Sequence, residues 1–167
     1  MISSKYKLIL FFTVFILLNF NYAKSQITNY ISPGLKLGYQ LGDNSGFTNG
    51  FIYGFEISFT KEINFKNNSS YGAVFNLDYC KGLTKIHIGA QISSVFGVEV
   101  GPTLLINDKL TEFGYTGNVF AGVFIMPYTE YSYFPSIDKT ISQYGIFIKR
   151  PYIYEDGKLS NISFKMN

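Results

Sequence analysis

The sequence predicts an all-β protein: an up-and-down antiparallel meander closed into a small β-barrel of about eight strands, after an N-terminal signal peptide. Three observations support this fold class. Beyond residue 30, apolar residues recur at every second position rather than every third and fourth. Short stretches rich in Gly, Asn, Asp and Pro separate the alternating segments. The chain also begins with the features of an export signal.

The export signal is expected to occupy residues 1–25. Lys5 and Lys7 precede an apolar run over residues 8–18, and a polar stretch with small residues follows. This run is shorter than the roughly 20 residues of a transmembrane helix, so we expect cleavage within residues 23–26, with an uncleaved anchor as the alternative. No cysteine lies near the expected cleavage site, which argues against a lipoprotein.

Residues 26–167 then form a single domain, because about 140 residues suffice for one hydrophobic core and not for two. Cys80 is the only cysteine, so an exported chain of this kind has no intramolecular disulfide. The formal charge of +3 includes the lysines of the signal peptide. The mature chain is therefore close to neutral, and nucleic acid is not an expected partner.

The composition indicates a protein surface with few charged residues. Charged residues make up 15% of the chain, compared with about 25% in ordinary soluble domains. Aromatic residues make up 19%, with 14 tyrosines and 17 phenylalanines, and there are 16 glycines. Part of the phenylalanine excess belongs to the export signal.

The first half of the domain contains four alternating segments. In "ISPGLKLGYQL", for example, Leu35, Leu37 and Tyr39 share one face, and Lys36 and Gly38 lie on the other. Turn-rich stretches over residues 42–50 and 64–70 separate the segments. We expect strands at residues 31–41, 51–60, 70–80 and 84–92.

The second half continues the meander with four further segments. Turn signals occur at residues 107–110 and 135–139. After Arg150, the stretch "EDGK" is another turn signal, so an additional hairpin arm is an open alternative for the C-terminal residues. We expect strands at residues 96–106, 114–125, 128–134 and 142–149.

The two faces of these strands differ in volume and charge. Phe, Tyr, Ile and Leu dominate one face, whereas the other carries most of the glycines and all the charged residues of the strand centres. The interior of an eight-stranded barrel just accommodates side chains, so small and charged residues fit there. We therefore expect a structural network of polar side chains in the lumen: Lys36, Glu56, Asp78, Lys85, His87, Glu99 and Lys149.

Segments such as "GVEVGPTLLI" and "YGAVFNLDYC" alternate apolar residues with small, polar or charged ones. Over residues 30–150 it resembles the small outer-membrane β-barrels of Gram-negative bacteria, by pattern rather than by a diagnostic motif. The resemblance implies a location in the cell outer membrane, membrane lipid as the partner, a monomer, and a structural, adhesive or envelope role without catalysis. The alternative is a soluble β-barrel or sandwich, periplasmic or secreted, whose aromatic face lines a cavity for a small apolar ligand.

Catalytic and metal-binding sites are not expected. His87 is the only histidine, and no serine or acid stands at a spacing that singles out a catalytic triad. One histidine and one cysteine do not form a set of metal ligands. No glycine-rich segment precedes a helix, so a phosphate-binding loop and its cofactors are not expected either.

The central hairpin carries a prediction of register. If Lys81-Gly82 forms the turn, Cys80 faces Leu83, Asp78 faces Lys85 and Asn76 faces His87. Only a register of this kind keeps the apolar residues of both strands on one face and the polar residues on the other. We expect an Asp78–Lys85 ion pair on the polar face, with Glu99 of the next strand near His87.

Overall fold

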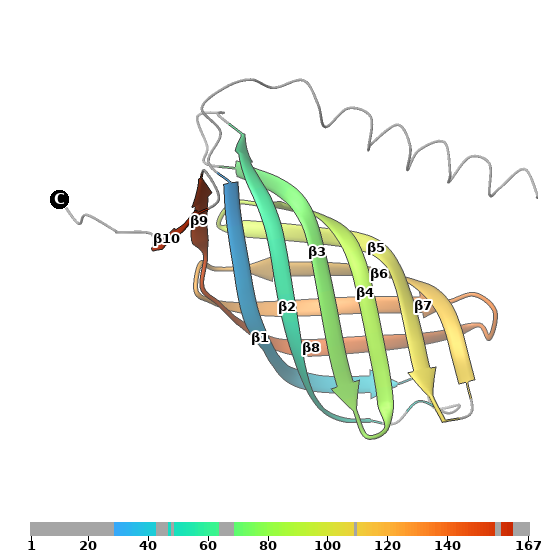
Figure 1. Ribbon diagram of the computed structural model, residues 1–167. Helices are drawn as coiled ribbons and strands as arrows, with labels where there is room; N and C mark the ends of the chain where they lie inside the picture. The colour runs from blue at the N-terminus through green and yellow to red at the C-terminus, as the bar shows by residue number, and fades with distance from the viewer. Residues whose placement is uncertain are drawn as a thin grey trace, which may run out of the picture.

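A computed structural model describes residues 29–42, 47, 49–63, 69–108, 110–155 and 158–161. The expected export signal lies outside these residues. The described chain is an antiparallel β-meander that closes into an eight-stranded barrel, which confirms the predicted fold class (Figure 1). The barrel has two rims. We call the rim where β1 begins and β8 ends the N-terminal rim, and the opposite one, which carries the turn Lys81-Gly82, the Lys81 rim.

The barrel strands are long. Each of the eight contains between 10 and 14 residues, because the alternation of apolar and small or polar residues continues without interruption from one turn to the next. Their bounds are β1 Asn29–Gly42, β2 Gly50–Ile63, β3 Ser69–Cys80, β4 Leu83–Ser93, β5 Phe96–Asn107, β6 Leu110–Ala121, β7 Ile125–Phe134 and β8 Lys139–Lys149.

The predicted sixth and seventh strands, at residues 114–125 and 128–134, differ from the structure. The sixth strand was expected over residues 114–125, but β6 ends at Ala121 and β7 begins at Ile125. Gly122, with a φ of 123°, turns the chain between them. The apolar alternation runs through Val123 and Ile125, so the pattern alone does not locate this turn.

The C-terminal residues form the additional hairpin that the turn signal suggested. Strands β9 (Tyr152–Glu155) and β10 (Lys158–Asn161) pair with each other, and β9 also pairs with the start of β1. This hairpin extends the sheet at the N-terminal rim (Figure 1). Residues 162–167 lie outside the described part of the chain.

Closure of the barrel comes from the pairing of β1 with β8. Following the paired residues once around the barrel leads from one position of β1 to another ten residues further on, which is the shear of the barrel. With strands ~4.8 Å apart and a rise of ~3.3 Å per residue, this shear tilts the strands by about 40°. The path runs through Asn29, Lys61, Tyr71, Ile92, Val98, Val119, Thr129, Tyr144 and Tyr39.

The predicted register of the central hairpin is confirmed. Asp78 faces Lys85, and Asn76 faces His87. Lys81 and Gly82 form the turn with φ values of 44° and 81°, the left-handed pair that a two-residue hairpin turn requires. Lysine is not a favourable residue at such a φ, so the pairing of the flanking strands stabilises the turn.

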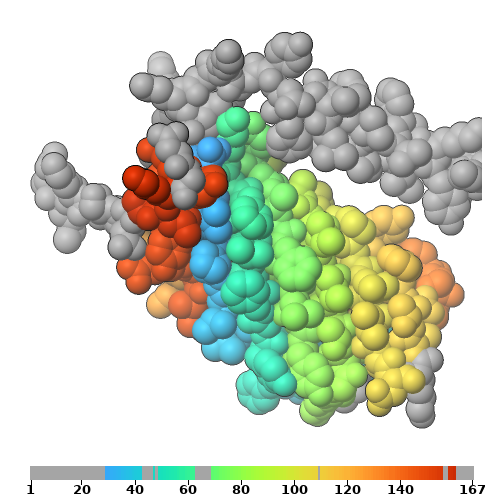
Figure 2. All heavy atoms as spheres, viewed as in Figure 1, coloured from blue at the N-terminus to red at the C-terminus, as the bar shows by residue number. Residues whose placement is uncertain are grey.

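Apolar side chains face outward from the barrel. Leu35 is 57% exposed, Phe113 71% and Phe51 80%. Their neighbours along the strands point inward and are buried, among them Lys36 and Ile52. Figure 2 shows the outer wall over β1 to β6 as a continuous layer of side chains that follows the tilt of the strands.

Candidate functional site

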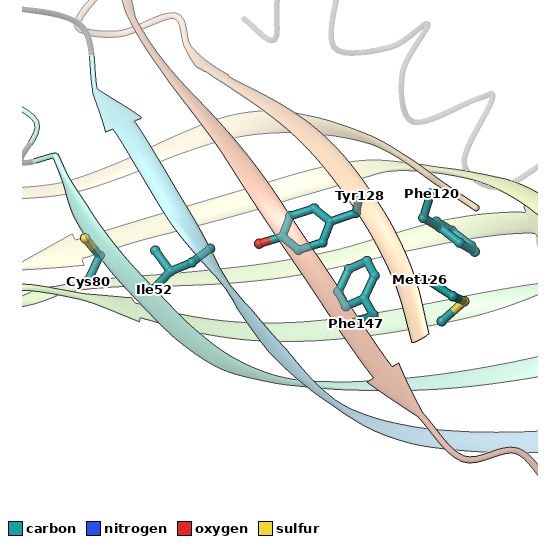
Figure 3. Packing of buried hydrophobic residues seen from close by; sticks show 6 residues of the cluster. All are labelled: Ile52, Cys80, Phe120, Met126, Tyr128 and Phe147. Carbon is teal, nitrogen blue, oxygen red and sulfur yellow. The ribbon is translucent and has the colours of Figure 1, made fainter. Parts of the chain in front are cut away.

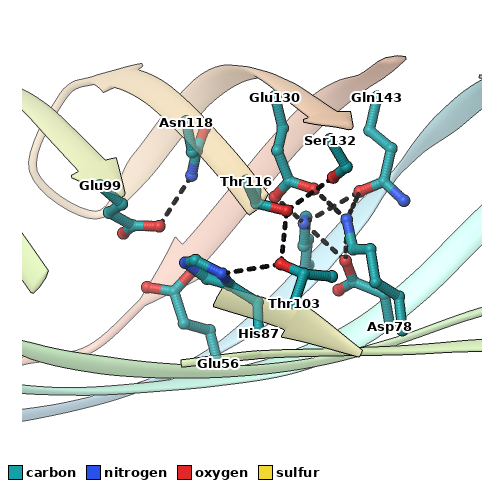
Figure 4. A network of polar contacts seen from close by, with 12 residues as sticks. Glu56, Asp78, His87, Glu99, Thr103, Thr116, Asn118, Glu130, Ser132 and Gln143 are labelled. Atoms are coloured by element: carbon teal, nitrogen blue, oxygen red, sulfur yellow. Dashed lines mark hydrogen bonds and ion pairs between the residues drawn. The ribbon is translucent and has the colours of Figure 1, made fainter. Parts of the chain in front are cut away.

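Four charged side chains form a closed quartet inside the barrel. Lys36 Nζ lies 2.7 Å from both Asp78 Oδ2 and Glu130 Oε2. Lys85 pairs with the same two carboxylates, at 3.0 Å from Asp78 Oδ2 and in close contact with Glu130 Oε1. All four side chains are at least 98% buried, so two positive and two negative charges balance each other away from solvent. Figure 4 shows Asp78 and Glu130 within this network.

Two glutamines extend the quartet toward the closure of the barrel. Gln143 Oε1 accepts hydrogen bonds from Lys36 at 3.1 Å and from Lys85 at 2.7 Å. Gln143 Nε2 in turn donates to Gln40 Oε1 at 3.0 Å. The network therefore joins side chains of β1, β3, β4, β7 and β8, and it crosses the β1–β8 closure from within.

A second charged cluster surrounds Lys149. Its ammonium contacts the Glu56 carboxylate and lies 3.7 Å from Glu99 Oε1. Asn118 Nδ2 donates to Glu99 Oε2 at 2.9 Å. The rings of Phe120 and Phe147 also face the Lys149 ammonium, with centroids at 5.1 and 4.8 Å. Carboxylates and aromatic rings thus both contact the buried ammonium of Lys149.

His87 belongs to a row of hydroxyl side chains rather than to an acid. Its Nδ1 lies 3.1 Å from both the Pro102 carbonyl oxygen and Thr103 Oγ1. A carbonyl oxygen only accepts, so Nδ1 carries the proton that it donates to Pro102. Glu99 was expected near His87, but Glu99 is the cross-strand partner of Gln91, and His87 is the partner of Thr103.

Apolar side chains share the lumen with the charged clusters. Tyr128 and Phe147 stack with centroids 4.5 Å apart, beside Phe120 and Met126 (Figure 3). A separate apolar cluster covers the lumen at the Lys81 rim, with Leu110 and Ile137 packed against it. Its buried members are Phe47, Leu83, Leu105, Phe134 and Ile141.

The N-terminal rim is open by comparison. A cavity of about 480 Å³ lies there, and Lys149 forms part of its lining. The other lining residues include hydroxyls and amides, such as Ser58 and Gln91, and apolar side chains, such as Phe120 and Met126. Among the described residues, apolar side chains thus close the lumen at the Lys81 rim, and a cavity of mixed lining lies at the N-terminal rim.

Every residue of the expected polar network lies inside the barrel. Lys36, Asp78 and Lys85 meet in the quartet, Glu56, Glu99 and Lys149 meet in the second cluster, and His87 lies among the hydroxyls. The alternation of each strand carries this information, because odd and even positions point to opposite faces.

Sequence reasoning missed Glu130 and Gln143. Glu130 shares its inward face with Tyr128, Ser132 and Phe134, while Tyr131 and Tyr133 face outward. Because aromatic residues occur on both faces, the sequence does not show which residues of this strand point inward. Balance of charge gives no signal for Glu130 either, because the predicted network already contains three lysines and three carboxylates.

This arrangement holds its charged groups in pairs and in hydrogen bonds. The carboxylates of the quartet are already paired with lysines, and the polar atoms of His87 and Thr103 are buried. Among the described residues, no group of three or more His, Cys, Asp or Glu side chains is placed to hold a metal ion.

Comparison with protein-family models, with curated protein sequences and with solved structures finds no match for this chain. Within the described residues, no helix is long and apolar enough to cross a membrane.

Proposed function

We propose that this chain is a small integral β-barrel of the bacterial outer membrane, monomeric, in contact with membrane lipid and without catalysis, with a structural or envelope role. The observation that carries the proposal is the inversion of the barrel: charged side chains are buried inside, and large apolar side chains cover the outside. A lipid environment favours this arrangement, because closure leaves no unpaired strand edge within the barrel wall and the apolar surface faces hydrocarbon.

A belt of tyrosines on the outer wall supports the proposal. Seven outward tyrosines lie toward the Lys81 rim, where the shear of the barrel brings them to similar heights. With a tilt of about 40°, they fall within about 7 Å of one another along the barrel axis. Tyrosine is enriched where a membrane meets water. The belt consists of Tyr39, Tyr53, Tyr79, Tyr115, Tyr131, Tyr133 and Tyr144.

The height of the apolar wall also fits a membrane. Eight residues separate Tyr53 from Lys61 on β2 and Tyr71 from Tyr79 on β3. At ~3.3 Å per residue and a tilt of about 40°, each stretch spans about 20 Å along the barrel axis. Outer-membrane barrels carry an apolar band about 25 Å tall between aromatic belts. On β2 and β3, the wall from the tyrosine belt to Lys61 and Tyr71 therefore approaches the height of such a band and is about 5 Å shorter.

The alternative, a soluble barrel that binds an apolar ligand, requires apolar side chains around a cavity. Phe55 is 42% exposed and Val98 49% exposed, both on the outer wall. The cavity at the N-terminal rim is lined by Lys149, hydroxyls and amides as well as by apolar side chains. These observations favour the membrane proposal.

A single tryptophan reports directly on the surroundings of each face, because the chain has none of its own. We expect Phe55→Trp, on the outer wall, to be strongly quenched by lipids with brominated acyl chains in vesicles that contain the refolded protein. Phe120→Trp is the matched control, since Phe120 is buried inside the barrel, and it should be quenched much less.

Fractionation of the native host tests the location. We expect the mature protein in the detergent-soluble outer-membrane fraction, with a gel mobility that changes on heating. Recovery from the soluble fraction without detergent, together with equal quenching of the two tryptophan variants, would overturn the proposal.

A further inference from the structure

The second charged cluster holds fewer ammonium groups than carboxylates. In the quartet, two ammonium groups lie between two carboxylates. Around Lys149, one ammonium faces the carboxylates of both Glu56 and Glu99. Gly34, between Lys149 and Glu56 in the register, makes room for this contact, since a Cβ atom there would lie 2.6 Å from Lys149 Cγ. Among the described residues, the cluster therefore carries one more negative than positive charge.

Buried acceptor atoms without a hydrogen-bond partner surround this cluster. His87 Nε2 is one of them, because Nδ1 carries the proton of the ring. Burial of a polar atom without a partner is costly, so these atoms indicate a donor that the described residues do not supply. The acceptors belong to Glu56, Asn76, His87, Gln91, Glu99 and Asn118, all at least 95% buried, and Asn76 Nδ2 is an unpartnered donor beside them.

The cavity at the N-terminal rim reaches this cluster. Lys149 and Gln91 both line the cavity, and Gln91 is the direct cross-strand partner of Glu99. A Cβ atom on Gly89 would lie 2.6 Å from His87 Nε2, so this ring atom points along β4 toward Gln91. In Figure 4, Glu56 and Glu99 lie on the side of the network away from Glu130 and Gln143. The cluster is therefore the inner end of the cavity.

The lining of the cavity has two sides. Hydroxyl and amide side chains come from β1 to β4, among them Ser32, Ser58 and Gln91. Phe120 of β6 and Met126 of β7 contribute apolar side chains. A bare metal ion makes no use of such an apolar side, whereas an organic cation with an alkyl chain contacts both. The lining thus favours an amphipathic cation.

We propose that this cavity binds a primary amine with a short alkyl chain. The ligand supplies the second ammonium between Glu56 and Glu99, as Lys36 and Lys85 supply two in the quartet. An ammonium has three donors, and hydrogen bonds to carboxylates are among the strong ones. The alkyl chain lies along the apolar side of the cavity. This inference goes beyond the proposed function, because it concerns the lumen and not the location of the barrel.

Calorimetric titration of the refolded protein in nonionic detergent, with empty micelles as the blank, tests the proposal. We expect saturable binding of one n-pentylammonium per barrel. Pentanol and pentanoate, which keep the chain and lose the ammonium, should bind at least about tenfold more weakly. Nα-acetyl-lysine amide carries the same ammonium on a peptide unit. Its binding would extend the site to lysine side chains of peptides, and its failure beside bound pentylammonium would assign the site to free amines.

Charge variants complete the test. Glu99→Gln should weaken pentylammonium binding at least about tenfold, because it removes the excess negative charge. Gln91→Leu, which removes an acceptor that lines the cavity, should also weaken it and serves if the first variant does not fold. Glu112→Gln is the control, since Glu112 bonds to Ser136 at the Lys81 rim, and it should bind as the unchanged chain does.

Three results would overturn the inference. They are the absence of saturable pentylammonium binding, equal affinity for pentanol and pentylammonium, and an affinity that both Glu99→Gln and Gln91→Leu leave unchanged. None of them bears on the membrane proposal, which the quenching and fractionation experiments test separately.

Discussion

At the scale of single residues, the lumen is stabilised by charges that each have more than one partner. Lys36 and Lys85 are both held between Asp78 and Glu130, and Gln143 accepts a hydrogen bond from each lysine. Burial of four charges is costly, and only dense pairing offsets that cost. Removal of one member therefore leaves a buried charge without its counter-ion.

A double-mutant cycle on Asp78→Asn and Lys85→Met measures this coupling. Each single variant should lower the free energy of unfolding by about 3–5 kcal/mol, because it leaves a partner unbalanced. The double variant should lose at least about 1 kcal/mol less than the sum of the two. Denaturant unfolding in detergent or vesicles gives the three values.

Asp78→Asn with Lys158→Met is the control cycle. Lys158 is exposed on β10, outside the barrel wall, so the two effects should add within about 0.5 kcal/mol. Strict additivity in the Asp78–Lys85 cycle as well would contradict the ion-pair network described for the lumen.

At the scale of elements, closure of the barrel depends on small residues where β1 meets β8. Gly38 and Gly145 are direct cross-strand partners. A Cβ atom on Gly145 would meet the Leu37 carbonyl oxygen and would lie 2.6 Å from Gly38 Cα. Both obstacles are backbone atoms, which cannot move aside as a side chain can, so only glycine allows the two strands to approach in this register.

Gly145→Ala is expected to lower the free energy of unfolding by about 1–3 kcal/mol, the cost of overpacking against a rigid neighbour. Gly117→Ala is the matched control. Gly117 also lies in the middle of a barrel strand, but a Cβ atom there meets nothing within 4 Å. This variant should be neutral or more stable by up to about 1 kcal/mol, because alanine restricts the unfolded chain. Equal destabilisation by the two variants would show that closure tolerates a side chain at position 145.

At the scale of the whole molecule, the barrel is a filled cylinder rather than a pore. Phe134 and Ile141 are fully buried in the apolar cluster at the Lys81 rim, and the charged quartet lies within the same lumen. The cavity at the N-terminal rim, which Lys149 helps to line, therefore does not continue through the barrel.

Planar bilayers that contain the refolded protein should show no steady ionic conductance, because side chains occupy the lumen of this eight-stranded barrel. The measurement needs proof of insertion, which heat-dependent gel mobility of the same sample provides. Reproducible conductance steps from inserted protein would mean that the apolar cluster and the quartet do not block the passage of ions.

Much of the fold follows from local pattern. Alternation with a period of two places Lys36, Glu56 and Glu99 on the glycine-rich face of their strands whatever the neighbouring strand is, because the two faces of a strand depend only on the backbone. The pairing of Asp78 with Lys85 is also local, since a two-residue turn joins their strands. The turn at Gly122 was missed because apolar residues alternate on both sides of it.

By itself, the sequence determined most of the strands, which residues share a face and the register of the central hairpin, because each depends on residues close together in the chain. Tertiary structure alone decided which face is inner, the shear of ten residues, and the meeting of Lys36 with Glu130 and Gln143. These contacts join residues far apart in sequence, and their geometry exists only once β1 pairs with β8 and closes the barrel.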